Sequence, residues 1–589
     1  MCGIIGYFGK KDALKILIDG LKKVEYRGYD SAGVAILKEG KLFVKKVVGK
    51  VEDLEKSLDF SNFDSELGIG HTRWATHGKV SIENAHPHLD CSEKIAIVHN
   101  GIIENYLELR KELIEKGHIF KSETDSEVIA HLIEENMKRL DFEDACIAAF
   151  NRLVGSFAIL AIYADKEKIV GVRKDSPLVL GLKNFKKVSN FEFFSEETFV
   201  GSDIYALLSY TNDFLFLQNF DIVVLEKGKV RLIGSNSNVE RIVEKITVNL
   251  DIGKGDFHHY MIKEILEEGD VFVNAFNQEE SKIRKIAEEL KNSKKVVFVA
   301  AGTSHHATLI AEYLFTSLGI YTKTILASEF PHNLPLVDDS TLVVAVSQSG
   351  ETADVIEAVK LAKSKGARVV SIVNVYESTI YREGDEKILM NAGPEVGVAA
   401  TKTYIAELAI FLRIYSELSK VYINPLEVRA KILETLGRSR REFIEKLAKK
   451  LKDSKSIFLI GRGIEYPLAL EAALKIKEIS YIHAEAFAGG EIKHGTIALI
   501  EKDTPCFVFE GDEEIYSNAQ ELKARGAHII GVGPKNHPVF DIWIKTPEHE
   551  NLSFIFQIIP MQLLAYLLAV EKGLDPDKPR NLAKSVTVK

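Results

Sequence analysis

The chain of 589 residues is too long for one domain and predicts three or four, and its 46% hydrophobic and 27% charged residues exclude long disorder and a fibrous repeat. Its 85 acidic residues outnumber the 76 basic ones and no sustained basic block occurs, so we expect small-molecule ligands and neither nucleic acid nor a membrane as partner. The four cysteines form no Cys-x-x-Cys pair, which argues against a disulfide framework and a thiolate zinc site and predicts a reducing, cytoplasmic location.

The first 240 residues are predicted to form a mixed, sheet-rich domain, because short β-branched or aromatic runs outnumber helical patterns. Strands are expected at 94–99, 156–163 and 220–224, and helices near 104–116 and 126–140. The chain opens with Met-Cys-Gly-Ile-Ile-Gly, which lacks the basic region and the length of a signal peptide. We therefore expect no export.

A polar, glycine-containing stretch at 251–256, followed by a helical pattern at 261–268, marks the expected end of this domain. Beyond about residue 290, buried strands alternate with amphipathic helices, which is typical of parallel α/β units. The pattern also repeats, because residues 295–302 align with 456–463 at an offset of 161, and 366–370 align with 526–530 at an offset of 160. The second half is therefore predicted to be a duplicated domain.

The uncharged run 552–570 has the length of a membrane span. Two glutamines, a proline and a tyrosine interrupt it, which favours a buried helix of a soluble domain. The tail after Gly573 holds two prolines and has no periodicity, so we expect an irregular segment that lies over another part of the fold.

Cys2 is the first candidate catalytic residue. Removal of Met1 would place a thiol and a free α-amine on one residue. Such an amine, with a reference pKa of about 7.7 to 8.0, can take the thiol proton and return it to a leaving group. Considered alone, Cys2 is equally well explained as a small residue at a frayed terminus.

Three further motifs offer groups that would bind an amino acid. Asn100-Gly101 is either a tight turn or the side-chain amide and backbone N–H of an oxyanion hole. Arg73, in the segment 70–78, would grip a carboxylate bidentately unless it forms an ordinary surface ion pair. Asp125, in the segment 122–126, either belongs to a helix cap or holds an ammonium group. Carboxylate and ammonium recognition together indicate an amino-acid substrate.

These motifs together resemble the glutaminase domain of the N-terminal-nucleophile amidotransferases. The resemblance rests on the segments 2–6, 26–33, 71–77, 84–88, 99–101 and 122–126. It implies an αββα fold in which Cys2 attacks the side-chain amide of glutamine, Asn100 and Gly101 form the oxyanion hole, and ammonia is released. It further implies that glutamine is bound by Arg73, Thr76, His77 and Asp125. Trp74 would gate an internal passage for ammonia.

A second candidate site follows the predicted strand 342–346, which runs into Ser347-Gln-Ser-Gly-Glu-Thr352 and then a helix. Backbone N–H groups at a helix N-terminus, supplemented by hydroxyls, make an anion site for which phosphate is the natural occupant, although a well-capped helix start has the same pattern. Gly302-Thr303-Ser304 offers a second set of donors at a neighbouring strand end, where ligands bind in open α/β sheets.

The duplicate acts as an internal control. It has Val508-Phe-Glu-Gly-Asp-Glu513 where the first copy has hydroxyls, and these carboxylates would repel phosphate, so only the first copy is expected to bind it. Gly461-Arg-Gly463 lacks the third glycine of a dinucleotide fingerprint and predicts a strand-to-helix turn. No nicotinamide cofactor is therefore expected.

The second copy and the tail carry further ionisable residues. Lys475 and Glu478 share a helix face, which by itself indicates no more than a surface ion pair. His494 lies beside glycines on a predicted loop, where a surface role is equally plausible. Lys584, among small and apolar neighbours, is a candidate for a Schiff base with a ketone if desolvation keeps it neutral, and a frayed terminus is the alternative.

These segments resemble the duplicated sugar-isomerase (SIS) domains, each a doubly wound parallel α/β sheet, of the isomerising glutamine:fructose-6-phosphate aminotransferases. With the glutaminase motifs, the resemblance covers essentially the whole chain in order. It implies a glutaminase domain at 2–240, a linker at 241–285, sugar-isomerase domains at 286–430 and 431–573, and an active-site tail at 574–589.

The same resemblance implies an activity and its residues. Glutamine and fructose 6-phosphate would give glutamate and glucosamine 6-phosphate, the first step of amino-sugar biosynthesis, with no cofactor and no metal, in a homodimer or higher homo-oligomer. Lys584 would form an imine with C2, Glu478 would move a proton between C1 and C2, Lys475 would steady the enolamine, and His494 from the neighbouring subunit would assist ring opening. The sugar phosphate would be held or lined by Thr303, Ser304, Ser347, Gln348, Ser349, Thr352, Val398 and Ala583.

The chain departs from the family pattern at Thr496, where Pro is expected, at Ala301, where Cys is common, and at His305-His306, where Tyr-Asn is usual. None of these is a catalytic position. Two alternatives remain at this stage. A glutaminase that feeds a phosphoribosyl pyrophosphate acceptor is disfavoured because the acidic run 337–341 precedes a strand instead of following one. A non-catalytic phosphosugar sensor would need a DNA-reading domain and would have no use for Cys2.

Overall fold

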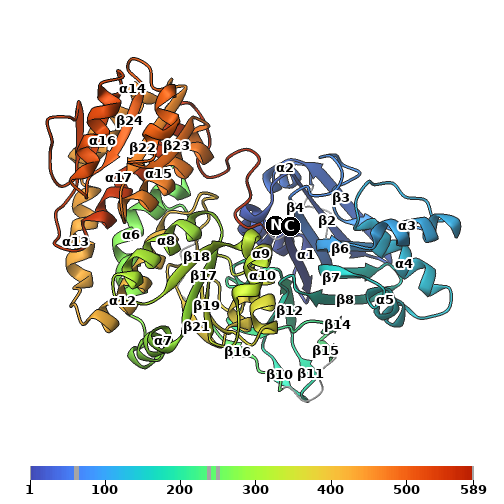
Figure 1. Cartoon of the computed structure of the whole chain (residues 1–589). Helices are drawn as coiled ribbons and strands as arrows, with labels where there is room; N and C mark the ends of the chain where they lie inside the picture. Colours follow the sequence, from blue (N-terminus) through green and yellow to red (C-terminus); the bar gives the residue numbers. More distant parts are fainter. Residues whose placement is uncertain (1, 59–64, 235–239, 247–252, 587–589) are drawn as a thin grey trace. The chain divides into compact units, whose positions relative to one another are not determined.

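The computed structural model describes residues 2–58, 65–234, 240–246 and 253–586. The chain divides into two compact units, residues 1–252 with 585–589 and residues 253–584 (Figure 1).

The first unit contains two eight-stranded antiparallel sheets. The first sheet has the order β16-β13-β9-β12-β1-β4-β2-β3 and the second the order β10-β11-β15-β14-β8-β7-β6-β5. The strands of the first sheet are β1 (Gly3–Phe8), β2 (Ser31–Lys38), β3 (Lys41–Val48), β4 (Leu67–Arg73), β9 (Val179–Lys183), β12 (Glu197–Gly201), β13 (Asp213–Phe216) and β16 (Glu244–Lys245). Those of the second are β5 (His88–Leu89), β6 (Ile95–Ile103), β7 (Gly155–Tyr163), β8 (Lys166–Lys174), β10 (Lys186–Lys187), β11 (Glu192–Phe194), β14 (Ile222–Glu226) and β15 (Lys229–Ile233).

Alternation along the strands assigns their side chains to two layers. In β1, Ile4 and Phe8 pack between the two sheets, whereas Ile5 and Tyr7 pack on the opposite face, because successive side chains of a strand point to opposite sides. The first sheet is covered by α1 (Ala13–Val24) and α2 (Val51–Lys56), and the second by α3 (Tyr106–Glu115), α4 (Glu127–Met137) and α5 (Phe142–Phe150). The predicted αββα fold of the first half is confirmed.

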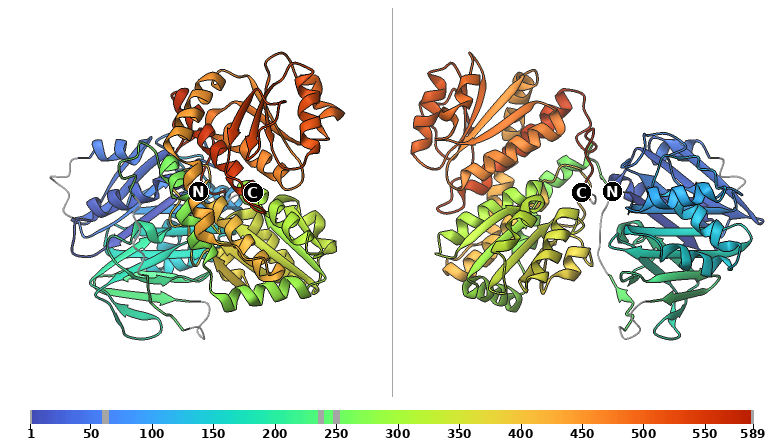
Figure 2. Two further views of the ribbon diagram at one scale, coloured as in Figure 1. Left: turned by 90° about the vertical axis from the view of Figure 1, so that its left-hand side faces the viewer. Right: turned by 45° about the vertical axis from the view of Figure 1, so that its right-hand side comes forward.

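The second unit contains two five-stranded parallel sheets of one topology (Figure 2). The first copy has the order β18-β17-β19-β20-β21 and the second the order β23-β22-β24-β25-β26, so each strand has an equivalent in the other copy. The strands are β17 (Lys295–Ala300), β18 (Thr322–Leu326), β19 (Thr341–Ser347), β20 (Arg368–Val373), β21 (Glu386–Leu389), β22 (Ser456–Gly461), β23 (His483–Ala488), β24 (Pro505–Phe509), β25 (His528–Gly533) and β26 (Ile542–Lys545). The predicted duplication and the doubly wound parallel fold are confirmed.

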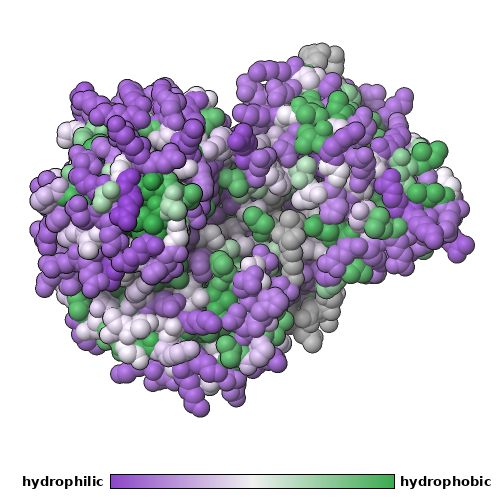
Figure 3. All heavy atoms as spheres, turned by 45° about the horizontal axis from the view of Figure 1, so that its top comes forward, coloured by the Kyte–Doolittle hydropathy of each residue, from purple (hydrophilic) through white to green (hydrophobic). Residues whose placement is uncertain are grey.

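Helices surround both sheets of this unit, and one apolar core runs through the two copies. The helices are α6 (Tyr260–Phe276), α7 (Glu280–Asn292), α8 (Gly302–Thr316), α9 (Phe330–Asn333), α10 (Ala353–Ser364), α11 (Thr379–Glu383), α12 (Lys402–Ser419), α13 (Pro425–Thr435), α14 (Arg438–Leu451), α15 (Glu465–Ser480), α16 (Glu514–Lys523) and α17 (Ser553–Glu571). Among the described residues, α17 is the one helix long and apolar enough to span a membrane, and 83% of that window is buried. It is the buried core helix that the sequence predicts. On the face drawn in Figure 3, hydrophilic side chains predominate and apolar ones form separate groups.

The structure decides between alternatives that the sequence left open at Asn100-Gly101 and at the acidic run 337–341. Asn100-Gly101 lies inside β6 and not in a turn after it. The acidic run 337–341 leads into the amino end of β19. A phosphoribosyl pyrophosphate site would need this run at the carboxyl end of a strand, so its position speaks against that alternative. After α17 no further helix or strand occurs among the described residues, as predicted for the tail.

Candidate active sites

Cys2 lies directly before β1, beside the carboxyl end of β4, because Gly3 pairs with Thr72 in the first sheet. The Sγ of Cys2 accepts a hydrogen bond from the backbone N–H of Trp74 at 3.3 Å and lies 3.6 Å from the Trp74 carbonyl oxygen. Burial raises the pKa of the thiol, and the Trp74 N–H and the Arg73 charge oppose this only in part. A nucleophilic Cys2 therefore needs a base.

Asn100 is held next to Cys2 by a neutral histidine. Its Nδ2 donates to the Cys2 carbonyl oxygen at 2.9 Å, and its Oδ1 lies 3.1 Å from the Nε2 of His71. The same Nε2 lies 3.0 Å from the His99 carbonyl oxygen, and since both partners are acceptors, Nε2 carries the proton. Burial lowers the pKa of His71 to about 3, which keeps the ring neutral.

Gly101 is required by the backbone. Its φ is +123°, and a Cβ at this position would lie 1.9 Å from the Ser156 carbonyl oxygen on β7. A residue with a side chain at position 101 would push β6 away from β7. The pairing of the two strands therefore fixes the position of the Gly101 backbone N–H.

The candidate glutamine-binding residues come from two segments beside Cys2. Arg73 is 4% exposed and donates to the carbonyl oxygens of His77, Gly78 and Lys79, so that it shapes the loop that also carries Thr76. Asp125 is also 4% exposed, and its Oδ2 accepts the backbone N–H of Ile103 at 2.8 Å. The charges of Arg73 and Asp125 both act on the Cys2 thiol, the first lowering and the second raising its pKa.

The candidate phosphate turn joins β19 to α10 and is closed by its own hydroxyls. The Oγ of Ser347 lies 2.9 Å from the Oγ1 of Thr352 and accepts the N–H of Gly350 at 3.1 Å. The N–H of Glu351 donates to the Oγ of Ser349 at 3.2 Å. Gly350 has a φ of +63°, and a Cβ there would lie 1.9 Å from the Ser378 Oγ, so the turn requires glycine.

Thr303 and Ser304 lie at the same sheet edge as this turn. They begin α8, which follows β17, and β17 pairs with β19 in parallel. The donors of both segments therefore gather at the carboxyl ends of neighbouring strands, as the sequence predicts.

The two copies meet at this edge through α8 and α15. The Nζ of Lys475 lies 2.6 Å from Glu478 Oε2 and 3.4 Å from Glu471 Oε1, and it donates to the Thr303 hydroxyl at 3.0 Å. Glu471 also accepts from Thr303 at 3.1 Å and lies 2.8 Å from the Nδ1 of His306. Burial would lower the pKa of Lys475, but the charges of Glu471 and Glu478 outweigh it and raise that pKa. The expected Lys475–Glu478 pair exists, yet it is part of a buried network and not a surface pair.

Ser304 donates to a second buried carboxylate. Its Oγ lies 2.6 Å from the Oε1 of Glu407 on α12. Burial raises the pKa of Glu407 to about 8, and the Ser304 hydrogen bond opposes this only in part. Glu407 is therefore protonated at neutral pH and is a neutral acid next to Ser304, a candidate sugar-phosphate donor.

Lys584 is fixed in the second unit by a carboxylate and a carbonyl. Its Nζ donates to Glu395 Oε2 at 2.5 Å and to the Gly397 carbonyl oxygen at 2.8 Å. Burial opposes the charged form of Glu395, but the Lys584 charge and the N–H groups of Thr401 and Thr403 outweigh it and lower the pKa of that carboxyl. The tail lysine thus faces a buried carboxylate and not the apolar surroundings that its neighbours in sequence indicate.

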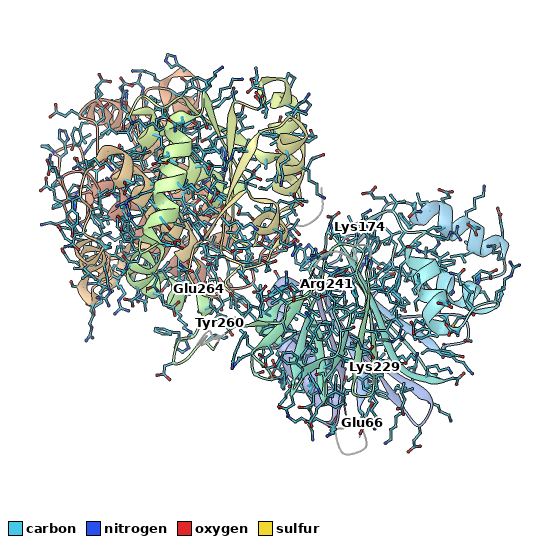
Figure 4. All side chains as sticks on the ribbon, turned by 90° about the horizontal axis from the view of Figure 1, so that it is seen from below. Glu66, Lys174, Lys229, Arg241, Tyr260 and Glu264 are labelled. Atoms are coloured by element: carbon cyan, nitrogen blue, oxygen red, sulfur yellow. The ribbon has the colours of Figure 1, made fainter. Side chains whose placement is uncertain are left out.

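The loop that carries Glu395 is anchored by the linker helix α6 and by the tail. The N–H groups of Val396 and Gly397 donate to Glu264 Oε1, at 2.5 and 3.2 Å. Glu264 and Tyr260, both on α6, are labelled in Figure 4. Burial and the neighbouring Glu395 raise the pKa of Glu264 to about 7, although Lys584 opposes the shift. Val398 donates its N–H to the Asp577 carbonyl oxygen at 3.1 Å, which brings Val398 close to the tail as expected.

The corresponding turn of the second copy is lined by carboxylates. Glu510 follows β24, and burial raises its pKa. Burial also raises the pKa of Glu465 to about 8, and the charges of Glu510 and Asp512 add to the shift. This environment disfavours negative charge, in agreement with the prediction that only the first copy binds phosphate.

Not all candidates are brought together. His494 is exposed on a short 3₁₀ turn, and within the described residues no hydrogen bond or ion pair joins its side chain to Lys584, Glu478 or the phosphate turn. The sequence reasoning missed the four buried carboxylates Glu264, Glu395, Glu407 and Glu471. For Glu407 and Glu471 the signal in the sequence is a single acidic residue within an apolar helical run, as at Glu407 between Ala406 and Leu408.

Family models match both units. A glutamine amidotransferase domain model matches residues 71–199, and an SIS domain model matches residues 289–415 and 450–572. The chain is 46% identical to a glutamine–fructose-6-phosphate aminotransferase (isomerizing) of Thermococcus kodakarensis and 44% identical to that of Pyrococcus horikoshii, over 100% of both chains in each case. Among solved structures, the C-terminal domain of the glucosamine-fructose-6-phosphate aminotransferase of Francisella tularensis covers 55% of this chain and 100% of its own length, with 31% identity and a TM-score of 0.50.

Proposed function

This chain belongs to the isomerizing glutamine–fructose-6-phosphate aminotransferases, and we propose that its Cys2 and Lys584 sites carry out the two halves of that reaction. The enzyme takes glutamine and fructose 6-phosphate as substrates, consistent with one glutamine amidotransferase domain and two SIS domains in the chain. The roles of individual residues are proposed from the contacts around Cys2 and Lys584.

In the glutaminase half, Cys2 attacks the side-chain amide carbon of glutamine, and its own α-amine, free once Met1 is removed, takes the thiol proton. Asn100 and the backbone N–H of Gly101 stabilise the oxyanion, which is supported by the contact of Asn100 Nδ2 with Cys2. The proton then passes to the leaving ammonia, and water hydrolyses the thioester to glutamate. Arg73 and Asp125 bind the α-carboxylate and α-ammonium groups, with Thr76 and His77 on the same loop.

In the sugar half, Lys584 attacks C2 of the open-chain ketose, and loss of water gives an imine. Glu395, which holds the Lys584 Nζ, is the nearest acceptor for the ammonium proton that must leave first. Ammonia adds to C2 of this imine and displaces the Lys584 amine, which leaves the C2 imine of ammonia. Glu478 then takes a proton from C1 and returns one to C2 through an enolamine that Lys475, three residues away on α15, stabilises. The product is the 2-amino aldose, which is released.

The sugar phosphate is bound at the first copy by Thr303, Ser304, Ser347, Gln348, Ser349 and Thr352, with Val398 and Ala583 lining the site. Trp74 gates the ammonia path. This role is supported by the contacts of its backbone N–H and carbonyl oxygen with the Cys2 Sγ, and by its ring, which packs edge-on to Tyr29 with the ring centroids 5.5 Å apart. A sealed path is needed because free ammonia is protonated in water and loses its nucleophilic lone pair.

The domain limits, the subunit arrangement and the location belong to the same proposal. The glutaminase domain spans 2–240, the linker 241–285, the two sugar-isomerase domains 286–430 and 431–573, and the tail 574–589. The enzyme acts in the cytoplasm as a homodimer or higher oligomer, and the exposed His494 of one subunit completes the sugar site of the other. None of the residues in this mechanism requires a metal or an organic cofactor.

The observation that carries the assignment is the pair of contacts that fixes Lys584 to Glu395 and Gly397. The test is to incubate the purified chain with glutamine and fructose 6-phosphate and to analyse the products by mass spectrometry. Glucosamine 6-phosphate and glutamate are expected in equal amounts. Glutamate without the amino sugar would contradict the coupling of the two sites.

A further inference from the structure

Four potential metal ligands converge in the first unit. Cys91 follows β5, His118 lies between α3 and α4, and His131 and Glu134 lie on α4. One ligand atom from each lies within 4.8 Å of every other. The two histidines are buried, Glu134 is half-buried and Cys91 is exposed, so the cluster is enclosed on the protein side and open to an ion from solvent.

Four of the six distances between the ligand atoms are close to those of a tetrahedral site, and all six are within 4.8 Å. The Cys91 Sγ lies 3.6 Å from the His131 Nδ1 and 3.8 Å from the His118 Nδ1. Glu134 Oε2 lies 2.9 Å from the His118 Nδ1 and 3.2 Å from the His131 Nδ1. Around a Zn²⁺ ion with bonds of about 2.3 Å to sulfur and about 2.0–2.1 Å to nitrogen and oxygen, tetrahedral neighbours lie about 3.6 Å (S to N) and about 3.3 Å (N to O) apart. The cluster thus needs only small adjustments to take the ion.

The outer faces of both histidines are turned toward carboxylates. His118 points its Nδ1 at the centre and its Nε2 at Glu135 Oε2, 3.0 Å away. His131 also points its Nδ1 at the centre, and its Nε2 lies 3.6 Å from Glu127 Oε1. A carboxylate behind the second nitrogen fixes the ring orientation and strengthens the ligating nitrogen, which is the usual arrangement around metal-binding histidines. The His118–Glu135 contact is within hydrogen-bond distance and the His131–Glu127 contact is at ion-pair distance, and an ion pair of the rings with Glu134 alone would require neither.

We propose that Cys91, His118, His131 and Glu134 bind a structural Zn²⁺ ion. One thiolate, two imidazoles and one carboxylate form a closed four-ligand set of the kind that zinc prefers, and binding releases the Cys91 thiol proton. The expectation of no metal rests on the absence of Cys-x-x-Cys spacing, which does not detect ligands from three separate segments.

The position of the ion explains what it would stabilise. Glu127 accepts the backbone N–H groups of Lys121 and Ser122, each at 2.7 Å, so the shell behind His131 also holds the segment that leads to Asp125. The ion would fasten this segment and α4 to the end of β5. Its role is therefore structural support beside the glutamine pocket and not a step of either reaction.

The experiment is metal analysis and Co²⁺ substitution of the full-length protein. Wild type is expected to carry about one zinc per chain, and the chelated protein, titrated with Co²⁺, is expected to develop a thiolate-to-cobalt charge-transfer band that added zinc removes. Cys91→Ser should lose the band and at least about 100-fold in zinc affinity, whereas Cys2→Ala, the matched control at the other solvent-accessible thiol, should keep both. Chelation should lower the melting temperature of wild type and of Cys2→Ala but not of Cys91→Ser.

A wild-type protein that neither carries zinc nor develops the cobalt band would overturn the site and would leave the histidines as ion-pair partners of Glu134. A band that persists unchanged in Cys91→Ser would assign the thiolate to another cysteine and would equally refute the proposal. Should Cys91→Ser fail to fold, the wild-type titration decides alone. Because these readouts use no substrate, they are independent of the proposed activity.

Discussion

Lys475 of the second copy donates to the Thr303 hydroxyl of the first copy at 3.0 Å, although 172 residues separate them in the chain. Thr303 belongs to the segment assigned to the sugar phosphate, and Lys475 to the helix assigned to isomerisation. Under the roles proposed above, the contact would join phosphate binding and proton transfer in one buried network. The first copy would then supply the phosphate donors and the second the ionisable groups.

Replacing Lys475, which supplies the ammonium group of this network, should lower both the stability of the fold and the activity. Lys475 and Glu471 are both 0% exposed, so Lys475→Met leaves a buried carboxylate without its main counter-charge, and a loss of about 3–5 kcal/mol in the free energy of unfolding is expected. The double variant Lys475→Met/Glu471→Gln should recover much of that loss but not the amination activity, as measured by thermal unfolding and product assay. Lys477→Met, on the exposed face of the same helix, should change stability by no more than about 0.5 kcal/mol. Equal destabilisation by Lys477→Met would contradict the buried network.

Cys2→Ala should remove glutamine hydrolysis and leave the sugar site working. We expect a loss of about a thousandfold or more in glutamate production, because no other nucleophile is proposed for this pocket. Ammonia-dependent formation of glucosamine 6-phosphate, measured with ammonium salts in place of glutamine, should stay within about twofold of wild type. Cys506→Ala, at a free cysteine of the second unit, serves as the control thiol and should retain glutaminase activity. Glutamine hydrolysis that survives in Cys2→Ala would remove Cys2 from the mechanism.

Borohydride reduction in the presence of fructose 6-phosphate should attach the sugar to Lys584. The expected product is a single modified peptide from the tail, identified by mass spectrometry, since reduction traps the imine as a stable amine. Lys584→Arg should abolish both the label and amination. The exposed Lys572, at the end of α17, provides the control variant Lys572→Arg, which should be labelled like wild type. A label on any other lysine refutes the imine assignment.

Ser347→Ala combined with Ser349→Ala should weaken sugar-phosphate binding selectively. Hydrogen bonds to a charged group contribute about 1.5–3 kcal/mol each, so the dissociation constant for fructose 6-phosphate should rise by about 100-fold or more. The KM for glutamine, measured by glutamate release, should stay close to wild type. Ser364→Ala, at the exposed end of α10, is the control and should change neither value. Equal effects of the double variant on both substrates would be incompatible with a phosphate turn.

Glu407 should make the stability of the protein fall as the pH rises. Its native pKa, raised by burial to about 8, lies above the ordinary value of 4.5, so the native state holds a proton that the unfolded state releases between these two values. Stability from this group is full below about pH 4.5 and is lost progressively as the pH rises toward 8. Glu407→Gln keeps a neutral acceptor for Ser304 and removes this dependence. Its melting temperature relative to wild type should therefore increase from pH 5 to pH 9.

Glu417→Gln on the same helix is the matched control, because interaction with Lys420 keeps the pKa of Glu417 below its usual value. That carboxyl is ionised in both states above pH 5, so the difference in melting temperature between Glu417→Gln and wild type should stay flat over the same range. A flat difference for Glu407→Gln as well would show that Glu407 is ionised in the native protein.

The sequence alone determined the parts of this protein that depend on local pattern. The apolar run of α17 predicted a buried helix, the alternation of strands and helices beyond residue 290 predicted the parallel α/β class, and the matches at offsets of 160 and 161 predicted the duplication. The αββα fold of the first half was predicted by the resemblance of its short motifs to a known family. The hydroxyl turn 347–352 was predictable for the same reason, since it is a continuous stretch whose backbone and side-chain donors act together.

Tertiary structure alone decided the partners of the ionisable groups. Glu471, Glu395 and the Cys91 cluster bind residues far away in the chain, and no periodicity records which helix will pack against which. For Lys475 the sequence left open a surface ion pair or an active-site role, and the structure buries it because α15 of one copy packs on α8 of the other. Burial and charge pairing are properties of that packing, so the electrostatics of the site appear only once the chain is folded.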